Sequence, residues 1–367
     1  MGYPVADDAA GAPHHAMTPT AYHMPAEWAH HAATWIAWPH NPDDWPGKFR
    51  PIPWVYAEIV RHLSRVEDVH ILVNDEAAER SANSILRRGG ANFARLHFHH
   101  WATDRAWLRD SGPIFVKDSQ GDLAITNWKF NAWAKYDNWR RDDQIPHHVA
   151  RLYSIPEIKP EIQLSNGKTH RLVLEGGSID TNGAGVLLTT EECLLSEVQQ
   201  RNPGVGRDQL EQAFHNHLGI AQTLWLHKGC AGDDTHGHID DVTRFVDENT
   251  ILTTVEPNTA DENHIPLAEN LDRLRSARNL VGKPFKIVEL PMPSPVIFEG
   301  QRLPASYANF YIANGLVLVP TFNDANDRRA LNIIAACFPD REVIGIHAVD
   351  LVWGLGTLHC LTQQEPA

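Results

Sequence analysis

The sequence contains few cysteines, and no two of them are closely spaced. Its four cysteines, Cys193, Cys230, Cys337 and Cys360, form no C-x-x-C pair. Structural zinc sites and the disulfide frameworks of secreted proteins need closer spacing or a higher cysteine density. The sequence therefore argues against both frameworks and favours a reducing compartment, so we expect a cytoplasmic protein.

Long apolar runs and positive charge are also scarce. No uncharged apolar stretch approaches the roughly 20 residues that a membrane-spanning helix needs. The chain has 32 lysines and arginines against 46 aspartates and glutamates, which leaves a net charge of −14. A surface with this charge repels nucleic acid and anionic membranes and favours cationic ligands. We therefore expect neither nucleic acid nor a membrane as a partner.

The beginning of the sequence differs in composition from the rest. Residues 1–20 are polar, rich in Ala, Asp and His, and lack the apolar segment of a signal peptide. We predict a flexible leader over 1–20 and a single domain over 21–367. Hydrophobic residues make up 43% of the chain and charged residues 21%, which is ordinary for a globular protein with a sizeable core.

Four segments share one pattern, in which two apolar strands flank a turn signal. Their turns fall 63 to 66 residues apart, near Ser119, Asn182, Glu248 and Asn314. The segments are "PIFVKDSQGDLAITNW" from Pro113, "SIDTNGAGVLLTTE" from Ser178, "TRFVDENTILTTVE" from Thr243 and "NFYIANGLVLVPTF" from Asn309.

The pattern continues after each hairpin with a helix and then a short strand. Helical spacing of apolar residues predicts helices over 142–153, 207–218, 267–280 and 327–337, followed by strands "RLVLE", "QTLWL", "KIVEL" and "EVIGI". The N-terminal part adds strand "ATWIAW", a helix over 54–63 and strand "VHILV", and its missing hairpin strand can be supplied by the C-terminus. Units of about 65 residues must bury their apolar faces on one another, and a closed α/β ring satisfies all five. The alternative is an α/β chain with chance regularity.

Residues with reactive side chains precede most of the hairpins. They are Asp110 in "WLRDSGP", Glu175 in "LEGGS", His238 and Asp240 in "HGHIDD", and Cys360 in "GTLHCLT". Loops at equivalent points of a ring meet at its centre. We therefore expect three acids, an imidazole and a thiol to converge on one site.

Cys360 is the candidate nucleophile of this site. A thiol attacks as the thiolate, which a nearby imidazolium or a bound cation favours. Gly354 and Gly356 precede Cys360 and permit a turn that exposes its side chain. Cys193 and Cys337 lie in apolar runs, and we interpret both as structural.

Histidine transfers protons near neutral pH, so His238 is the candidate acid and base. On a strand-like "HIDDVTRFV" the side chains of His238 and Asp240 would share one face. Asp110 and Asp240 are suited to hold a planar guanidinium, which offers a fixed fork of N–H donors. Glu175 can orient His238 or stabilise its charge.

Two other classes of function stay open at this stage. The run His236, His238 and Asp240 is similar to the ligands of a dinuclear metal hydrolase, but no matching second histidine cluster is present. A binding protein without catalysis is the other alternative. It would make the thiol, the imidazole and the acids coincidental.

The motifs resemble those of the agmatine deiminase family, which is related to bacterial peptidyl-arginine deiminase within the guanidino-group-modifying superfamily. The matching stretches run in the family's order over nearly the whole chain. They are "MPAEWAHHAATWIAWPHN", "WLRDSGPIFV", "NWKFNAW", "LEGGSIDTNGAGVLLTTEECLL", "GHIDDVTRFV" and "LHCLTQQ".

The resemblance implies a five-bladed α/β propeller (a pentein) with pseudo-fivefold ββαβ repeats. It implies hydrolysis of agmatine to N-carbamoylputrescine and ammonia without cofactor or metal, and a homo-oligomer, as a dimer. By motif, Cys360 is the nucleophile, His238 the acid and base, Glu175 its partner, and Trp107 lines the channel. Asp110 and Asp240 hold the guanidinium. Departures at Ala29, His236, Asp241, Leu355 and Thr357 leave other substrates open, such as peptidyl arginine or another alkylguanidine. An amidinotransferase on the same scaffold, which passes the amidino group to an amine, is a further alternative.

Overall fold

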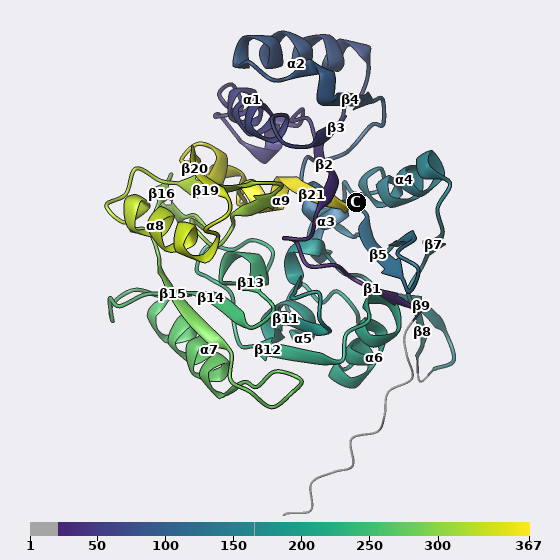
Figure 1. Ribbon diagram of the computed structural model, residues 1–367, viewed down its shortest axis with the longest axis vertical. Helices are drawn as coiled ribbons and strands as arrows, with labels where there is room; N and C mark the ends of the chain where they lie inside the picture. The colour runs from purple at the N-terminus through teal and green to yellow at the C-terminus, as the bar shows by residue number, and fades with distance from the viewer. Residues whose placement is uncertain (1–20, 165) are drawn as a thin grey trace, which may run out of the picture.

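The structure is a computed structural model that describes residues 21–164 and 166–367, so the predicted leader over 1–20 lies outside the described residues. The fold is mixed α/β, as predicted. Figure 1 shows small sheets placed around a common centre, with the longer helices towards the outside. Among the described residues, no helix combines the length and apolar character needed to cross a bilayer.

Five sheets share one construction, in which an antiparallel pair of strands is extended by a parallel strand. All four predicted hairpins are present as the antiparallel pairs. The first four sheets, in chain order, are β1 (Tyr22–His23), β5 (Ile114–Asp118), β6 (Leu123–Thr126) and β7 (Glu157–Ile158); β10 (Asp180–Thr181), β11 (Val186–Thr190) and β12 (Gln222–Leu226); β13 (Thr243–Asp247), β14 (Thr250–Val255) and β15 (Lys286–Pro291); and β18 (Tyr311–Ala313), β19 (Leu316–Thr321) and β20 (Glu342–His347).

The fifth sheet joins the two ends of the described chain. Strand β2 (His31–Ala37) pairs antiparallel with β21 (Thr362–Pro366) and parallel with β3 (Asp68–Leu72). The predicted completion of the N-terminal unit by the C-terminal strand is therefore confirmed. This unit also carries helix α2 (Glu76–Gly89) and strand β4 (Leu96–His99), which the repeat pattern did not predict.

The helices between the sheets largely occupy the predicted ranges. They are α1 (Ile52–Leu63), α4 (Ile145–Tyr153), α6 (Arg207–Leu218), α7 (His264–Ser276) and α8 (Asp327–Cys337). Helix α7 lies several residues earlier than predicted, because the side chain of Asn279 accepts the backbone N–H groups of Val281 and Lys283 and so forms a turn. Proline at position 266 is tolerated in the first helical turn.

The predicted strand "RLVLE" is wrong as the return strand of its unit. The parallel partner of β6 is β7. Leu172, Val173 and Leu174 are all buried, so this segment crosses the interior, and it makes a single bridge from Val173 to Lys129. Two small hairpins outside the repeat complete the strands, β8 (Glu161–Gln163) with β9 (Thr169–Arg171) and β16 (Ile297–Phe298) with β17 (Gln301–Arg302).

One short helical turn precedes the hairpin in four of the five units. These turns are α3 (Leu108–Ser111), η5 (Gly176–Ser178), η6 (Ile239–Asp241) and α9 (Leu358–Leu361). Contacts join α3 to both α9 and η5, and η5 to η6. The repeated construction thus brings four turns from distant parts of the chain to one place.

Trp35 in the centre of β2 tests how far the fifth sheet depends on its core. Its side chain is fully buried, stacks on His70 with ring centroids 4.2 Å apart, and donates a hydrogen bond of 2.7 Å to Glu365 in β21. We expect Trp35→Ala to lower the free energy of unfolding by about 3–5 kcal/mol, because it leaves a cavity and removes one of the two hydrogen bonds that Glu365 Oε2 accepts, the other coming from Tyr153. Urea denaturation measures this change.

The matched control is Trp54→Ala, because Trp54 is 40% exposed on α1. Its loss should cost about 1 kcal/mol or less. Equal losses of stability in the two variants would contradict the importance given to the β2–β21 contact.

Candidate active site

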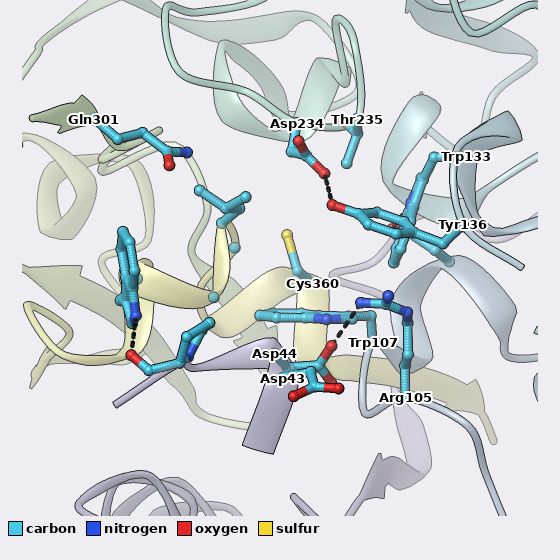
Figure 2. Close-up of a pocket in the computed structure, with 16 residues that line it drawn as sticks. Asp43, Asp44, Arg105, Trp107, Trp133, Tyr136, Asp234, Thr235, Gln301 and Cys360 are labelled. Carbon is cyan, nitrogen blue, oxygen red and sulfur yellow. Dashed lines mark hydrogen bonds and ion pairs between the residues drawn. The ribbon is translucent and has the colours of Figure 1, made fainter. Parts of the chain in front are cut away.

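Cys360 lines a cavity of about 200 Å³ and belongs to the one-turn helix α9. Figure 2 shows its sulfur directed towards the middle of the surrounding side chains. The thiol is 5% exposed, so it is accessible only through this cavity. Asn309 donates a hydrogen bond of 3.1 Å to the sulfur. A methyl group on Gly356 would lie 3.2 Å from the sulfur, which explains a glycine at that position.

Two carboxylates flank the thiol, and both belong to the predicted set. Asp240 in η6 places Oδ2 3.7 Å from the sulfur of Cys360. Asp110 in α3 lines the same cavity, and it accepts hydrogen bonds from Trp133 Nε1 at 2.8 Å and from the backbone N–H of Gly177 at 3.0 Å. Within the described part of the chain, Asp240 Oδ1 has no hydrogen-bond partner. That oxygen is therefore available to a ligand.

His238 lies between the two carboxylates and Glu175. Its Nδ1 is 3.8 Å from Asp110 Oδ1 and 3.9 Å from Asp240 Oδ1, and its Nε2 is 3.7 Å from Glu175 Oε2. The expected strand at "HIDD" is wrong, because β13 begins only at Thr243. His238 instead caps the 3₁₀ turn η6. Ile239 and Asp241 are also buried, so a strand with one solvent-facing side does not fit this segment.

Gly177 shows how closely these groups approach one another. A methyl group added to its Cα would lie 2.6 Å from His238 Nδ1, 2.8 Å from Asp110 Oδ1 and 3.1 Å from Asp240 Oδ2. One backbone position thus touches the imidazole and both clamp carboxylates. Only glycine leaves room there for all three side chains.

Glu175 is held by a buried arginine. Arg201 Nε donates to Glu175 Oε1 at 3.0 Å, and both side chains are fully buried. Burial alone would raise the pKa of Glu175, but Arg201 and His238 lower it to about 2. The carboxylate is therefore ionised at neutral pH and can stabilise a positive charge on His238.

Without substrate, His238 and Cys360 do not form an imidazolium–thiolate pair, because the imidazole is protonated but the thiol is not. Burial opposes charge on His238, but Asp110, Cys193 and Glu175 raise its pKa well above the usual value. Burial also raises the pKa of Cys360, and Asp240, Asp241 and Asp110 raise it further. The empty site therefore holds a protonated imidazole and a neutral thiol near pH 7.

The cavity wall combines aromatic rings with acids. Trp107 lies beside the sulfur, since a methyl group on Gly356 would contact its ring at 2.8 Å, and Trp133, Tyr136 and Trp353 add further aromatic surface. Asp43, Asp44 and Asp234 also line the cavity. The wall thus suits an elongated ligand with apolar methylenes and positive charge.

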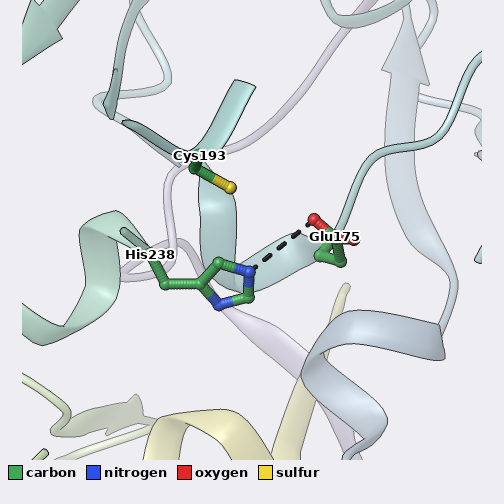
Figure 3. A group of neighbouring side chains, drawn as sticks. All are labelled: Glu175, Cys193 and His238. Atoms are coloured by element: carbon green, nitrogen blue, oxygen red, sulfur yellow. Dashed lines mark ion pairs between the residues drawn. The ribbon is translucent and has the colours of Figure 1, made fainter. Parts of the chain in front are cut away.

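His236 takes no part in a metal site with His238 and Asp240. Its backbone has a φ of 64°, and its Nε2 lies 3.1 Å from Ser196 Oγ. Among the described residues, the group within metal-ligand reach is Glu175, Cys193 and His238, whose ligand atoms lie within 4.8 Å of one another (Figure 3). This group shares Glu175 and His238 with the predicted site, so a metal there would compete with their proton transfer. Cys193, which we interpreted as structural, contributes directly to the surroundings of His238.

Sequence reasoning missed three residues that contact the site. Asn309 precedes β18, which is the position that carries a site residue in the other units, so the repeat could have identified it. His359 adjoins Cys360 and binds Asp240 at 2.7 Å. Glu27 in "MPAEW" contacts His359 at 2.7 Å, although 332 residues separate the two along the chain. No local sequence pattern predicts that contact.

Comparison with known proteins gives a consistent result. Agmatine deiminase of Stutzerimonas stutzeri is 32% identical over 94% of this chain and 96% of its own. The structure of agmatine deiminase of Enterococcus faecalis superposes with a TM-score of 0.84 at 28% identity, covering 94% of this chain and 96% of that chain. A cysteine-to-serine variant of C. jejuni agmatine deiminase with substrate bound gives a TM-score of 0.82, at 28% identity and the same coverage. Residues 23–366 match the model of the Porphyromonas-type peptidyl-arginine deiminases, and the chain belongs to this family.

Proposed function

We propose that this protein is an agmatine deiminase, a hydrolase that converts agmatine to N-carbamoylputrescine and ammonia. One observation carries the proposal: Asp240 lies within 4 Å of both the sulfur of Cys360 and the imidazole of His238, at the end of a cavity with acidic walls. The agmatine deiminases described above, which align over nearly the whole chain, support the substrate.

We also propose that the five sheets form a five-bladed propeller with pseudo-fivefold symmetry. Each sheet pairs one antiparallel and one parallel neighbour, and β21 supplies the missing strand of the first unit. A propeller of this kind directs the turn before each hairpin towards the axis. The position of the site residues at those turns supports this architecture.

The charge of the cavity favours a substrate with a second cation over free arginine. Asp43, Asp44 and Asp234 line the wall, and the one arginine among its lining residues, Arg105, donates to Asp44 at 2.6 Å. Asn138 accepts further hydrogen bonds from the same guanidinium, at 3.1 and 3.2 Å. A substrate carboxylate would therefore compete with partners already in place. Asp44 and Asp234 are paired with Arg105 and Lys135, so the ammonium of agmatine would meet Asp43, whose carboxylate has no ion pair among the described residues.

In the first half of the reaction the guanidinium binds between Asp110 and Asp240. Its positive charge offsets two of the carboxylates that raise the pKa of the thiol, so Cys360 releases its proton to solvent water more easily once substrate is bound, while His238 keeps its own proton. The thiolate attacks the guanidinium carbon and forms a C–S bond. His238 gives its proton to one terminal nitrogen, the C–N bond breaks, and ammonia leaves. An S-alkylthiouronium remains on Cys360.

In the second half, His238 is neutral and removes a proton from water as the water attacks the same carbon. The C–S bond then breaks, the thiolate is restored, and the urea group of N-carbamoylputrescine is formed. Glu175, fixed by Arg201, holds His238 in place through both steps. Trp107 shields the adduct from bulk water.

From the sequence we further propose a small cationic guanidine as the only ligand required for turnover, a homodimer, one domain over residues 21–367, and a cytoplasmic location. The acidic net charge is compatible with each of these.

The first test measures ammonia release from agmatine, free arginine and a blocked arginyl peptide under identical conditions. We expect kcat/KM for agmatine to exceed that for arginine by at least about 100-fold, because an unpaired carboxylate in the acidic cavity is costly. Activity should persist in the presence of a chelator. Preference for the peptide, or loss of activity on chelation, would contradict the proposal.

The covalent step is tested with paired cysteine variants. Cys360→Ala should reduce activity by at least about 1,000-fold, because no other group supplies the nucleophile. Cys337→Ala is the control, since Cys337 lies at the end of α8 and is not among the residues of the cavity. Mass spectrometry of the wild-type enzyme, quenched with acid during turnover of agmatine, should detect an adduct on Cys360. If Cys360→Ala is active and no adduct forms on Cys360 in the enzyme that retains it, this covalent route is excluded.

The pKa shift of Cys360 predicts how the free enzyme reacts with iodoacetamide. A raised pKa leaves little thiolate at pH 7, and the thiolate fraction grows about tenfold for each pH unit below that pKa. Alkylation of Cys360, followed by mass spectrometry without substrate, should therefore accelerate up to pH 9 without levelling off. A plateau below pH 7 would show a thiolate formed in advance and contradict the predicted charge state.

A further inference from the structure

A buried series of hydrogen-bonded side chains runs from Asp240 into the core. It takes no part in the reaction described above. His359 Nδ1 lies 2.7 Å from Asp240 Oδ2, and His359 Nε2 lies 2.7 Å from Glu27 Oε2. The histidine is 2% exposed. Because a carboxylate oxygen only accepts hydrogen bonds, a ring that binds one carboxylate through each nitrogen donates from both. Such bonds are charge-assisted and short.

Glu27 is anchored at its far end. Its Oε1 accepts the backbone N–H of Ile312 at 2.8 Å, and its Oε2 accepts from Arg244 Nη2 at 2.8 Å. Arg109 Nη2 lies 3.4 Å from the same oxygen. Burial alone would raise the pKa of Glu27, but Arg244, His359 and Arg109 together hold it well below the usual value. The carboxylate of Glu27 is therefore a fixed negative charge.

The contact with His359 determines how the carboxylate of Asp240 is oriented. With Oδ2 bound to His359, the carboxylate cannot rotate freely, and its Oδ1 is the oxygen without a partner among the described residues. His359 also adjoins the nucleophile, and its backbone N–H donates to Asn309 Oδ1 at 3.1 Å. Asn309 in turn donates to the sulfur of Cys360 at 3.1 Å. His359 thus fixes both the carboxylate of Asp240 and the backbone next to Cys360.

We infer that Glu27 and His359 are positioning residues, which hold Asp240 so that one oxygen is bound to His359 and the other is free for a planar cation. We call the three residues Glu27, His359 and Asp240 the carboxylate relay. The inference rests on the proposed function, because it assigns the relay to guanidinium binding.

Two substitutions of His359 separate the two ends of the relay. The amide of asparagine occupies roughly the place of Nδ1, and that of glutamine the place of Nε2. His359→Asn therefore keeps a donor for Asp240, whereas His359→Gln keeps one for Glu27 and releases Asp240. We expect kcat/KM for agmatine to fall about tenfold in His359→Asn and about 100-fold in His359→Gln, with much of the loss in KM.

The control is His62→Gln, because His62 on α1 is also buried but contacts Arg61 and Arg65 and is not among the residues that line the cavity. It should retain the wild-type kcat and KM. Urea denaturation of all three variants shows whether each is folded under the assay conditions. A purely structural role for His359 predicts equal losses in the Asn and Gln variants that follow stability, and that result would overturn the inference.

A second readout does not require turnover. Chloroacetamidine is a planar cationic alkylating agent, whereas iodoacetamide is neutral, so the ratio of their labelling rates at Cys360 reports on the clamp itself. We expect this ratio to fall about tenfold or more in His359→Gln and to be largely retained in His359→Asn. An unchanged ratio in His359→Gln would overturn the relay even if the wild-type enzyme hydrolyses agmatine. If the wild-type enzyme does not hydrolyse agmatine but the labelling ratios change as expected, the proposed substrate is wrong and the positioning role of the carboxylate relay is retained.

Discussion

The site depends on the placement of one carboxylate, that of Asp240, among charges that are all removed from water. Its two oxygens differ in their partners: Oδ2 binds the imidazole of His359, and Oδ1 has no hydrogen-bond partner among the described residues. The thiol of Cys360 and the imidazole of His238 both lie within 4 Å of this carboxylate. Burying so many charges is costly unless each has a partner, and here Arg201 and Arg244 supply compensating positive charges to Glu175 and to Glu27 and Asp180.

In the proposed mechanism the site binds a cation although the thiol must become an anion. Without that cation, burial and the acids around Cys360 oppose ionisation of the thiol. A guanidinium would change the balance, because it brings positive charge to these acids. Substrate recognition and activation of the nucleophile are then the same electrostatic event, because a neutral molecule of similar size brings no charge to offset the carboxylates.

Much of the fold could be predicted because its repeat appears in the local pattern of apolar and turn residues. The hairpins, the ranges of α6 and α8 and the pairing of β2 with β21 all follow from that pattern. The same regularity indicated the turns that carry Asp110, Glu175, His238 and Cys360. Asn309 occupies the equivalent position, before the hairpin of the remaining unit. It was not predicted because its amide side chain is unreactive.

The parts that were not predicted depend on contacts between distant residues. Residues 171–175 have the composition of a strand, but three buried side chains in succession place them in the interior. The "HIDD" run has strand-like alternation, yet a 3₁₀ turn is required to bury all its side chains. The link from Glu27 to His359 spans almost the full length of the chain, and no sequence window contains both residues.

The order of the site residues along the chain has a consequence for the making and breaking of the protein. Asp110, Glu175, His238 and Asp240 all precede the nucleophile, which lies directly before the strand that completes the first sheet. A ribosome therefore adds the thiol after every other part of the site. A product that ends before this segment lacks both the thiol and β21, the strand that pairs with β2. The segment that completes the first sheet is thus also the one that supplies the thiol.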